Sequence, residues 1–156
     1  DAAHRMEALI GDLLTLARQG QRVGDLEPVA LDVVAETAWS QLDADEKELV
    51  AETDSRVEAD FDRLQELFDN LFRNALTHGG AETVRVVDTD GGFAVVDDGT
   101  GIPPTQRETI FERGFTTSEE GTGFGLAIVD TIVRAHDWSI TVGRSDAGGA
   151  RFEITT

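Results

Sequence analysis

The sequence contains no cysteine, a single lysine and no long hydrophobic run. Without cysteine, neither a disulfide framework nor a thiolate metal site can form. No apolar run approaches the roughly 18 residues that span a bilayer, so we expect a soluble, cytoplasmic domain whose parent protein can still be membrane-anchored. No signal-peptide pattern opens the chain, and its start at Asp1 leads us to expect a piece of a longer protein.

Basic residues are scarce, because 13 Lys and Arg stand against 31 Asp and Glu, which gives a formal charge of −18. A surface of this sign repels nucleic acid and anionic membranes, so we expect neither as a partner. The hydrophobic content of 40% argues against disorder. Acidic, lysine-poor but well-patterned sequences are typical of salt-accumulating archaea, where ions screen self-repulsion. We therefore expect a haloarchaeal source, with an acidic mesophilic domain as the alternative.

Hydrophobic periodicity predicts an α+β fold. Apolar residues at helical spacing over 4–19 predict an amphipathic helix whose apolar stripe meets another helix or a second copy of the chain. Further helices are expected at 32–45, 61–78 and 125–136, and strands at 28–31, 49–52, 57–59, 83–88, 93–97, 139–144 and 150–155. Because these elements do not alternate as regular βαβ units, we expect a two-layer sandwich, with a mixed sheet covered on one face by about three helices.

The segment EEGTGFGLAIV places Gly121, Gly123 and Gly125 directly before a predicted helix. Glycine costs a helix roughly 0.5–1 kcal/mol relative to alanine, and a common reason for such a loop is anion binding at a helix start. A Walker loop is excluded because Lys47 lies far from any glycine cluster, and a dinucleotide-binding loop is disfavoured because no strand precedes the glycines. A flap that closes over a nucleotide and an ordinary mobile loop remain.

Two asparagines and a histidine are spaced to share one edge of the helix predicted at 61–78. Asn70, Asn74 and His78 follow one another at i, i+4 steps. Asparagine is a poor helix former, and an amide oxygen is a suitable ligand for Mg²⁺, which shares its other positions with water and phosphate. The alternative is a solvated polar face.

The segment AVVDDGTGIPP ends a predicted strand in Asp97 and continues through Gly99 and Gly101. A carboxylate at a sheet end, with bare backbone beside it, can accept a hydrogen bond from the exocyclic amine of adenine. Guanine would present a carbonyl there and be repelled. The alternatives are an acidic, calcium-like turn and a plain hairpin.

Four motifs in one order resemble those of the catalytic ATP-binding domain of sensor histidine kinases, within the superfamily that includes gyrase, heat-shock chaperone and mismatch-repair ATPases. NLFRNALTH resembles the N box, DDGTGI the first glycine box, IFERGF the phenylalanine box and GTGFGL the second glycine box. The resemblance covers about residues 26–156, so we assign 23–156 to this domain. Residues 1–22 resemble the second helix of the dimerisation and phosphotransfer hairpin.

The resemblance implies ATP and Mg²⁺ as ligands. Asn74 would coordinate Mg²⁺, with Asn70 beside it and His78 near the phosphates. Asp97 would bind the adenine amine. The other implied nucleotide contacts are Gly99 and Gly101 in the pocket floor, Ile102 against the base, Phe111 and Phe115 as anchors of a lid at about 103–124, Gly121, Thr122, Gly123, Gly125 and Leu126 in the second glycine box, and Arg73 or Arg113 near phosphate.

The resemblance also implies phosphotransfer to a histidine. In the ATPase relatives a glutamate that activates water stands at the position of Asn70, and an amide cannot act as that base. His4 lacks the proline-containing motif of the phospho-acceptor, so we expect the acceptor to lie outside this chain. The implied partners are a second copy of the chain, through the N-terminal helix, and the receiver domain of a response regulator. A hydrolytic ATPase and a non-catalytic nucleotide-binding module remain alternatives.

Two further departures from the family pattern concern the lid and the last helix. No lysine or arginine occurs between Gly114 and Val133, so we expect weak nucleotide binding that depends strongly on Mg²⁺ and salt. His136 is expected to interact with the C-terminal end of its helix. Asp137 stands at the corner after the last predicted helix, where members of the family commonly have a glycine.

Overall fold

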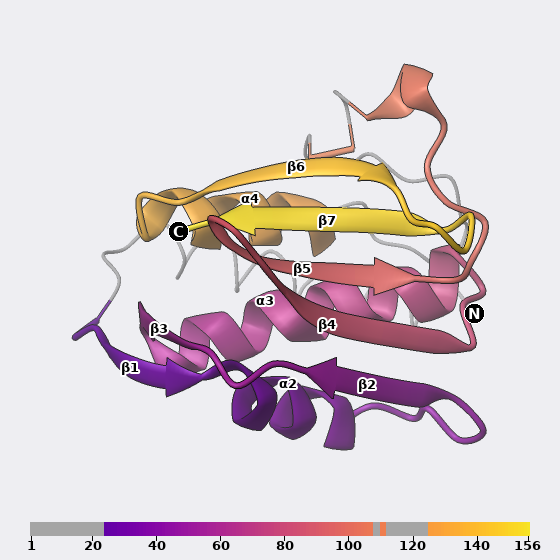
Figure 1. Ribbon diagram of the computed structural model, residues 1–156. Coiled ribbons are helices and arrows are strands. Elements are labelled where there is room, and N and C mark those ends of the chain that lie inside the picture. Colours follow the sequence, from indigo (N-terminus) through magenta and orange to yellow (C-terminus); the bar gives the residue numbers. More distant parts are fainter. Residues whose placement is uncertain (1–23, 108–109, 112–124) are drawn as a thin grey trace, which may run out of the picture.

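The computed structural model describes residues 24–107, 110–111 and 125–156 (Figure 1), so the helix expected at 4–19 lies outside the described residues. The strands are β1 (Glu27–Ala30), β2 (Glu48–Glu52), β3 (Arg56–Ala59), β4 (Thr83–Thr89), β5 (Gly92–Asp97), β6 (Ser139–Arg144) and β7 (Ala150–Thr155). The helices are α2 (Leu31–Ser40), α3 (Phe61–Arg73) and α4 (Gly125–Ala135), with a π-helical turn η1 (Asn74–His78) and a 3-10 turn η2 (Pro104–Gln106). Each helix and strand expected after residue 24 is present.

Five strands form one mixed sheet in the order β2-β4-β5-β7-β6. β2 runs parallel to β4, and the other neighbouring pairs are antiparallel. β1 and β3 form a separate antiparallel pair. The three helices lie on one face of the five-stranded sheet (Figure 1), which confirms the predicted α+β sandwich. Within the described ranges, no helix is long and apolar enough to cross a membrane.

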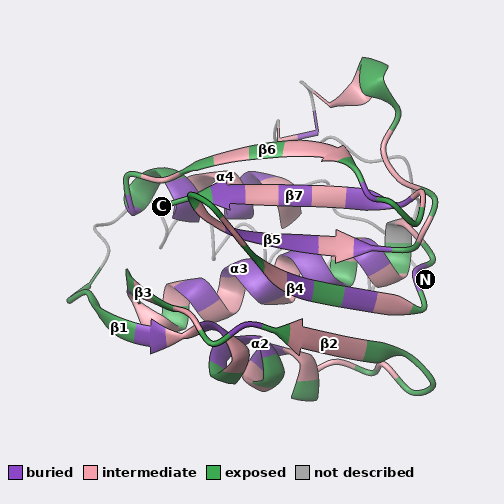
Figure 2. Cartoon of the chain, in the orientation of Figure 1, coloured by how far each residue is buried: buried purple, intermediate pink, exposed green. Residues whose placement is uncertain are grey.

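The hydrophobic core lies between the sheet and the helix layer, where buried residues of β5, β7, α3 and α4 face one another (Figure 2). The buried side chains of α3 recur at helical spacing: Leu64, Leu67, Phe68, Leu71 and Phe72. The ring centroids of Phe68 and Phe93, which lies in β5, are 5.6 Å apart, and those of Trp39 in α2 and Phe72 are 5.3 Å apart. Aromatic contacts therefore place α3 between α2 and the middle of the sheet.

The start of α3 is tied to the end of α4. Asp60 is the N-cap of α3, and its Oδ1 accepts the backbone N–H groups of Asp62 (3.1 Å) and Arg63 (3.3 Å). The backbone N–H of Asp60 donates to Nε2 of His136 (3.1 Å), whose Nδ1 lies 2.8 Å from the carbonyl oxygen of Ile132. This arrangement suits a neutral imidazole with its proton on Nδ1. His136 contacts the end of its own helix, as expected.

One helix boundary differs from the sequence-based expectation, and one corner is made without the glycine that is common in the family. The helix predicted at 32–45 ends at Ser40. Asp43 and Asp45 follow it, and negative charge is unfavourable at the C-terminus of a helix, where the helix dipole is also negative. Asp137 has a φ of 60°, in the left-handed region that glycine adopts most readily. Aspartate is one of the few other residues that tolerate this conformation, so the corner is kept without glycine.

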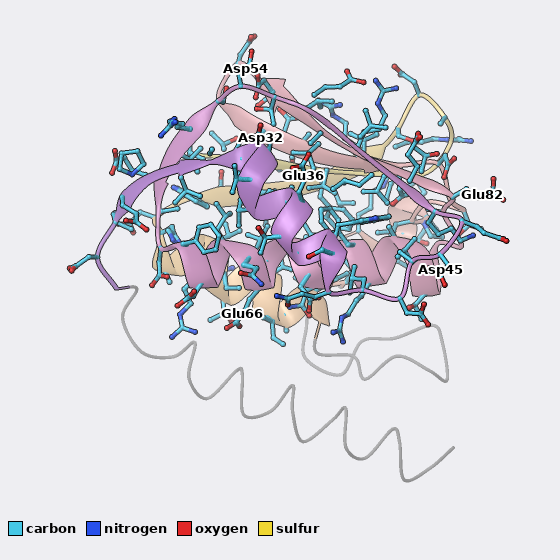
Figure 3. The ribbon with its side chains drawn as sticks, turned by 90° about the horizontal axis from the view of Figure 1, so that it is seen from below. Asp32, Glu36, Asp45, Asp54, Glu66 and Glu82 are labelled. Atoms are coloured by element: carbon cyan, nitrogen blue, oxygen red, sulfur yellow. The ribbon has the colours of Figure 1, made fainter. Side chains whose placement is uncertain are left out.

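Acidic side chains cover the surface around α2 and the neighbouring loops. Figure 3 shows them extending outward from several elements rather than gathering at one point. Those labelled are Asp32, Glu36, Asp45, Asp54, Glu66 and Glu82. With a formal charge of −18 on the chain, their mutual repulsion opposes the compact state.

We expect KCl to raise the free energy of unfolding, measured by urea denaturation. The screening length falls from about 10 Å at 0.1 M salt to about 3 Å at 1 M, which weakens repulsion between surface carboxylates. A variant with exposed charges removed (Glu36→Gln, Asp45→Asn, Asp54→Asn and Glu82→Gln) should show a flatter response to KCl. Sucrose, which screens no charge, is the control and should affect both proteins equally. An unchanged salt response in the variant would show that repulsion is not the cause.

Candidate functional site

β5 carries Asp97 to its C-terminal end, on the side of the sheet that the helices cover. Successive side chains of a strand point to opposite faces. Phe93 and Val95 are buried, and Phe93 contacts Phe68 of α3. Asp97 is two residues beyond Val95, so it shares their face, and it is only 6% exposed. The predicted carboxylate therefore lies at the end of the strand and faces the helix layer.

The two carboxylate oxygens of Asp97 have different surroundings. Oδ1 accepts the backbone N–H groups of Gly99 (2.9 Å) and Ala150 (3.1 Å). Burial raises the pKa of the Asp97 carboxyl above its ordinary value, the two N–H groups lower it, and the charge of Asp98 raises it. Oδ2 accepts no hydrogen bond from the described residues. The backbone thus orients one oxygen and leaves the other for a different donor.

The turn after β5 packs backbone against backbone on the end of the long helix. The N–H of Thr100 donates to the carbonyl oxygen of Gly79 (2.9 Å), and a Cβ added to Gly99 would lie 2.4 Å from the same oxygen. Gly101 has a φ of +76°, and a Cβ there would lie 2.9 Å from the carbonyl oxygen of Gly148. One glycine of the predicted box therefore allows contact with the helix end, and the other allows contact with the β6–β7 turn.

Asn70 lies in the last turn of α3, and Asn74 is the first residue of η1. Nδ2 of Asn70 donates to the carbonyl oxygen of Glu66 (2.8 Å). A Cβ added to Gly125 would lie 3.4 Å from Oδ1 of Asn70, so α4 begins beside this amide. The side chain of Asn74 is half-buried and makes no hydrogen bond to the described residues. Its amide oxygen can therefore serve as a ligand.

The helix widens at Asn74, which alters the predicted row of side chains. Asn70 and Asn74 are one α-helical step apart, but η1 continues as a π-helix. The N–H of Gly79 donates to the carbonyl oxygen of Asn74 (3.1 Å), the i to i+5 bond of a π turn. The expected i, i+4 spacing therefore holds from Asn70 to Asn74 and not from Asn74 to His78. The side chain of His78 lies outside the described set.

Three predicted contact residues pack at the base of the expected lid. Ile102, Phe111 and Leu126 are partly buried against the hydrophobic core. The ring of Phe111 lies 6.3 Å from that of Phe152 in β7, in an edge-to-face arrangement. Phe111 therefore anchors the beginning of the phenylalanine box to the sheet, as an anchor of the lid would require.

Of the remaining predicted residues, the structure describes Arg73 alone. Arg73 donates from Nε to Asp69 (3.2 Å) and is 64% exposed, so it forms a surface ion pair. The other predicted lid residues lie outside the described residues: Arg113, Phe115, Gly121, Thr122 and Gly123.

The sequence from β3 onward matches a known family. Residues 59–156 match the family described as histidine kinase-, DNA gyrase B- and HSP90-like ATPase. The chain belongs to this family. The matched range contains Asn70, Asn74 and Asp97, so the site described above lies wholly within the family's shared part.

Curated proteins of similar sequence are named as sensor histidine kinases. The sensor histidine kinase ZraS of Salmonella typhi is 34% identical over 164 aligned residues, which cover 97% of this chain and 35% of that protein. CpxA of Escherichia coli strain K12, also a sensor histidine kinase, is 32% identical, with 97% of this chain and 37% of that protein covered. The chain thus spans about a third of the length of the curated relatives it matches.

Solved structures of family members share the fold. The ATP-binding domain of PrrB from Mycobacterium tuberculosis superposes with a TM-score of 0.66 at 27% identity, covering 85% of this chain and 96% of that one. ShkA, solved at full length in complex with AMPPNP, superposes with a TM-score of 0.74 at 27% identity, covering 94% of this chain and 34% of that one. The predicted resemblance to the ATP-binding domain of histidine kinases is confirmed.

Sequence reasoning missed three residues around Asp97. Oδ1 of Asp98 accepts the N–H groups of Glu82 (2.8 Å) and Thr83 (3.1 Å), and the bond from Thr83 is the main cause that lowers the pKa of the Asp98 carboxyl. This carboxylate joins the start of β4 to the end of β5. Ser145 and Gly149 also contact Asp97. In sequence they belong to SDAGGA, which signals a turn and nothing about what the turn touches.

Replacing Gly99 by alanine should destabilise the fold at the contact between β5 and η1. The added methyl group would overlap the backbone of Gly79, which cannot move as a flexible side chain would, and we expect a loss of about 1–3 kcal/mol in the free energy of unfolding. Gly143→Ala in β6 is the control, because a Cβ there meets nothing within 4 Å. Urea denaturation of both variants measures the difference. Equal midpoints would contradict the close approach of the two backbones.

Proposed function

We propose that this chain binds ATP together with Mg²⁺, and that in the full-length protein it transfers the γ-phosphate to a histidine. The observation that carries the proposal is the buried Asp97 carboxylate at the end of β5, with one oxygen held by backbone N–H groups and the other without a donor among the described residues. Family membership and the kinase names of the relatives support the same function.

Asp97 would recognise the base. Its Oδ2 would accept a hydrogen bond from the exocyclic amine of adenine, a charge-assisted bond in a site sheltered from water. Guanine would place a carbonyl oxygen against the carboxylate and be disfavoured. Gly99 and Gly101 keep the backbone beside Asp97 bare, and Ile102, which is partly buried against the core, would pack on the flat face of the base.

Asn74 would hold the metal ion. Mg²⁺ prefers hard oxygen ligands and retains several waters, which fits a neutral amide oxygen better than a cluster of carboxylates. Asn74 fits this role because its side chain makes no hydrogen bond to the described residues. Asn70 lies one helical step earlier, and His78 follows in η1. When bound, Mg²⁺ would neutralise negative charge on the phosphates.

The start of α4 would receive phosphate. The first N–H groups of a helix have no partner within the helix and lie at the positive end of its dipole. A Cβ added to Gly125 would lie 3.4 Å from Oδ1 of Asn70, so the helix start adjoins the residue one helical step before the proposed metal ligand Asn74. Leu126, packed on the core, would hold this end of the helix in place. We assign phosphate contacts also to Gly121, Thr122 and Gly123, and lid anchoring to Phe115.

The side chains near Asn70 favour transfer over hydrolysis. An amide is not a general base, and Nδ2 of Asn70 is already committed to the carbonyl oxygen of Glu66. The nearest carboxylates of α3, Glu66 and Asp69, form ion pairs with Arg63 (3.5 Å) and Arg73 (3.2 Å). Because the described side chains near Asn70 offer no uncommitted base to activate water, the bound γ-phosphate would be retained for a positioned nucleophile.

The proposal extends to the whole protein. We infer that residues 1–22 continue a dimerisation and phosphotransfer hairpin and that 23–156 form the catalytic domain, with a lid at about 103–124. The full-length protein would form a homodimer through the N-terminal helix, pass the phosphate to the receiver domain of a response regulator, and act in the cytoplasm. The acidic composition supports a salt-rich source, for which haloarchaea are our proposal.

Adenine nucleotide with Mg²⁺ should raise the melting temperature, and guanine nucleotide should not. A ligand at a hundredfold excess over its Kd adds about 2.7 kcal/mol to the free energy of unfolding. Asp97→Asn removes the charge from the adenine acceptor and should weaken ATP binding at least about tenfold. Asn74→Ala should remove the dependence on Mg²⁺. Asp90→Asn, an exposed change in the β4–β5 turn, is the control and should bind as the unmodified protein does. Unchanged binding in both site variants would refute the site.

Full-length protein given ATP labelled at the γ-phosphate should become labelled on histidine while releasing little free phosphate. The labelled bond should be acid-labile and stable to base, as a phosphoramidate is. Asn74→Ala should abolish labelling because the metal ligand is lost. Release of free phosphate without labelled protein would indicate a hydrolytic ATPase. Binding of ATP with neither product would indicate a non-catalytic module.

A further inference from the structure

The turn between β6 and β7 closes over the backbone of Asp97. Oγ of Ser145 donates to the carbonyl oxygen of Asp97 (2.7 Å) and accepts the N–H of Gly149 (2.9 Å). The N–H of Ser145 donates to the carbonyl oxygen of Gly149 (2.9 Å). The N–H of Gly148 donates to the carbonyl oxygen of Ser145 (3.0 Å). One serine therefore closes its own turn and joins that turn to the residue that carries the proposed adenine acceptor.

These contacts replace the regular pairing of two strands. β5 and β7 pair as far as Val96 and Arg151, so Asp97 and Ala150 would be the next pair. There the N–H of Ala150 donates to the side-chain Oδ1 of Asp97, and the backbone carbonyl of Asp97 accepts from Ser145. The Ser145 hydroxyl thus bonds the backbone carbonyl of Asp97 just beyond the end of the strand pairing, while the N–H of Ala150 orients the carboxylate.

The backbone of Gly149 lies so close to Asp97 that a side chain at position 149 would not fit. A Cβ added to Gly149 would lie 2.2 Å from the carbonyl oxygen of Asp97 and 2.3 Å from its Oδ1. Ser145 is 6% exposed, and a buried hydroxyl is costly unless its donor and an acceptor position are both used, as they are here. The geometry at Oδ1 therefore depends on a turn that Ser145 holds in place.

We propose that Ser145 is a positioning residue for adenine recognition, which holds the β6–β7 turn so that Ala150 engages Oδ1 of Asp97 and Oδ2 faces the exocyclic amine. This inference rests on the proposed function of Asp97. Ser145 does not touch the nucleotide. Its loss lets the carboxylate rotate, so the expected effect is on base discrimination rather than on the metal or the phosphates.

The test compares ATP with purine riboside triphosphate, which lacks the exocyclic amine, each with Mg²⁺. Calorimetry gives the ratio of the two Kd values, which reports the amine contact alone. The unmodified protein should prefer ATP by about tenfold or more, the scale of one charge-assisted hydrogen bond. Ser145→Ala should reduce this ratio at least threefold, with the Mg²⁺ dependence of binding unchanged. Ser145→Thr keeps the hydroxyl and should retain most of the ratio.

Thr53→Ala is the matched control. Thr53 is buried, and its hydroxyl donates to Asp88 and accepts from the N–H of Ser55, so its loss also removes a bonded hydroxyl, but away from Asp97. It should lower stability and leave the ratio unchanged. If Ser145→Ala does not fold, Ser145→Cys, of similar size but with a weak donor, should show the reduced ratio.

The possible results separate the two proposals. If the unmodified protein prefers ATP and Ser145→Ala keeps that preference while losing stability, Ser145 is only a structural residue and this inference is overturned. If the unmodified protein shows no preference and Asp97→Asn binds as well as it does, the proposed function of Asp97 fails first. A reduced ratio in Ser145→Ala, with Thr53→Ala and Ser145→Thr unaffected, supports the positioning role.

Discussion

A buried carboxylate at the end of β5 determines how the backbone is arranged around it. Burial disfavours the ionised form of Asp97, and the N–H groups of Gly99 and Ala150 offset part of that cost. Both donors must reach the same oxygen, so the turn after β5 and the start of β7 converge on one atom. Such convergence leaves no room for side chains, which explains why Gly149 lies against Asp97. The glycines here serve close approach of backbone segments.

The same convergence connects the two halves of the proposed site. The carbonyl oxygen of Gly79 accepts the N–H of Thr100, and the N–H of Gly79 donates to the carbonyl oxygen of Asn74. A short path of backbone hydrogen bonds therefore runs from the turn after β5 to the proposed metal ligand. The π turn makes the path possible, because it shifts Gly79 from the partner an α-helix would give it, Ala75, to Asn74. The proposed positions for base recognition and metal binding are thus held relative to one another by main-chain hydrogen bonds.

Local patterns in the sequence were sufficient for the elements and for the motif residues. The apolar periodicity that predicts α3 and the patterns that predict the adjacent strands β6 and β7 are local signals, and the structure confirms these elements. The contacts of Ser145 could not be predicted, because its hydroxyl bonds to a residue 48 positions away. The π turn was also missed, since NALTH continues an ordinary helical pattern. Long-range pairing and small changes of helix type have no short-range sequence signal.

Charge limits what this site can use to hold a triphosphate. The arginines of α3 and α4, Arg63, Arg73 and Arg134, each form an ion pair with an acidic residue three or four positions away. In the part of the chain that the structure describes, these helices therefore offer no unpaired cation to phosphate. At α3 and α4, neutral groups and the proposed metal ion would then have to supply the attraction, against the repulsion of a chain with a charge of −18. We expect the binding free energy from the phosphate end to be small and sensitive to ions, so the proposed hydrogen bond to the adenine amine would contribute a larger share of the total binding free energy.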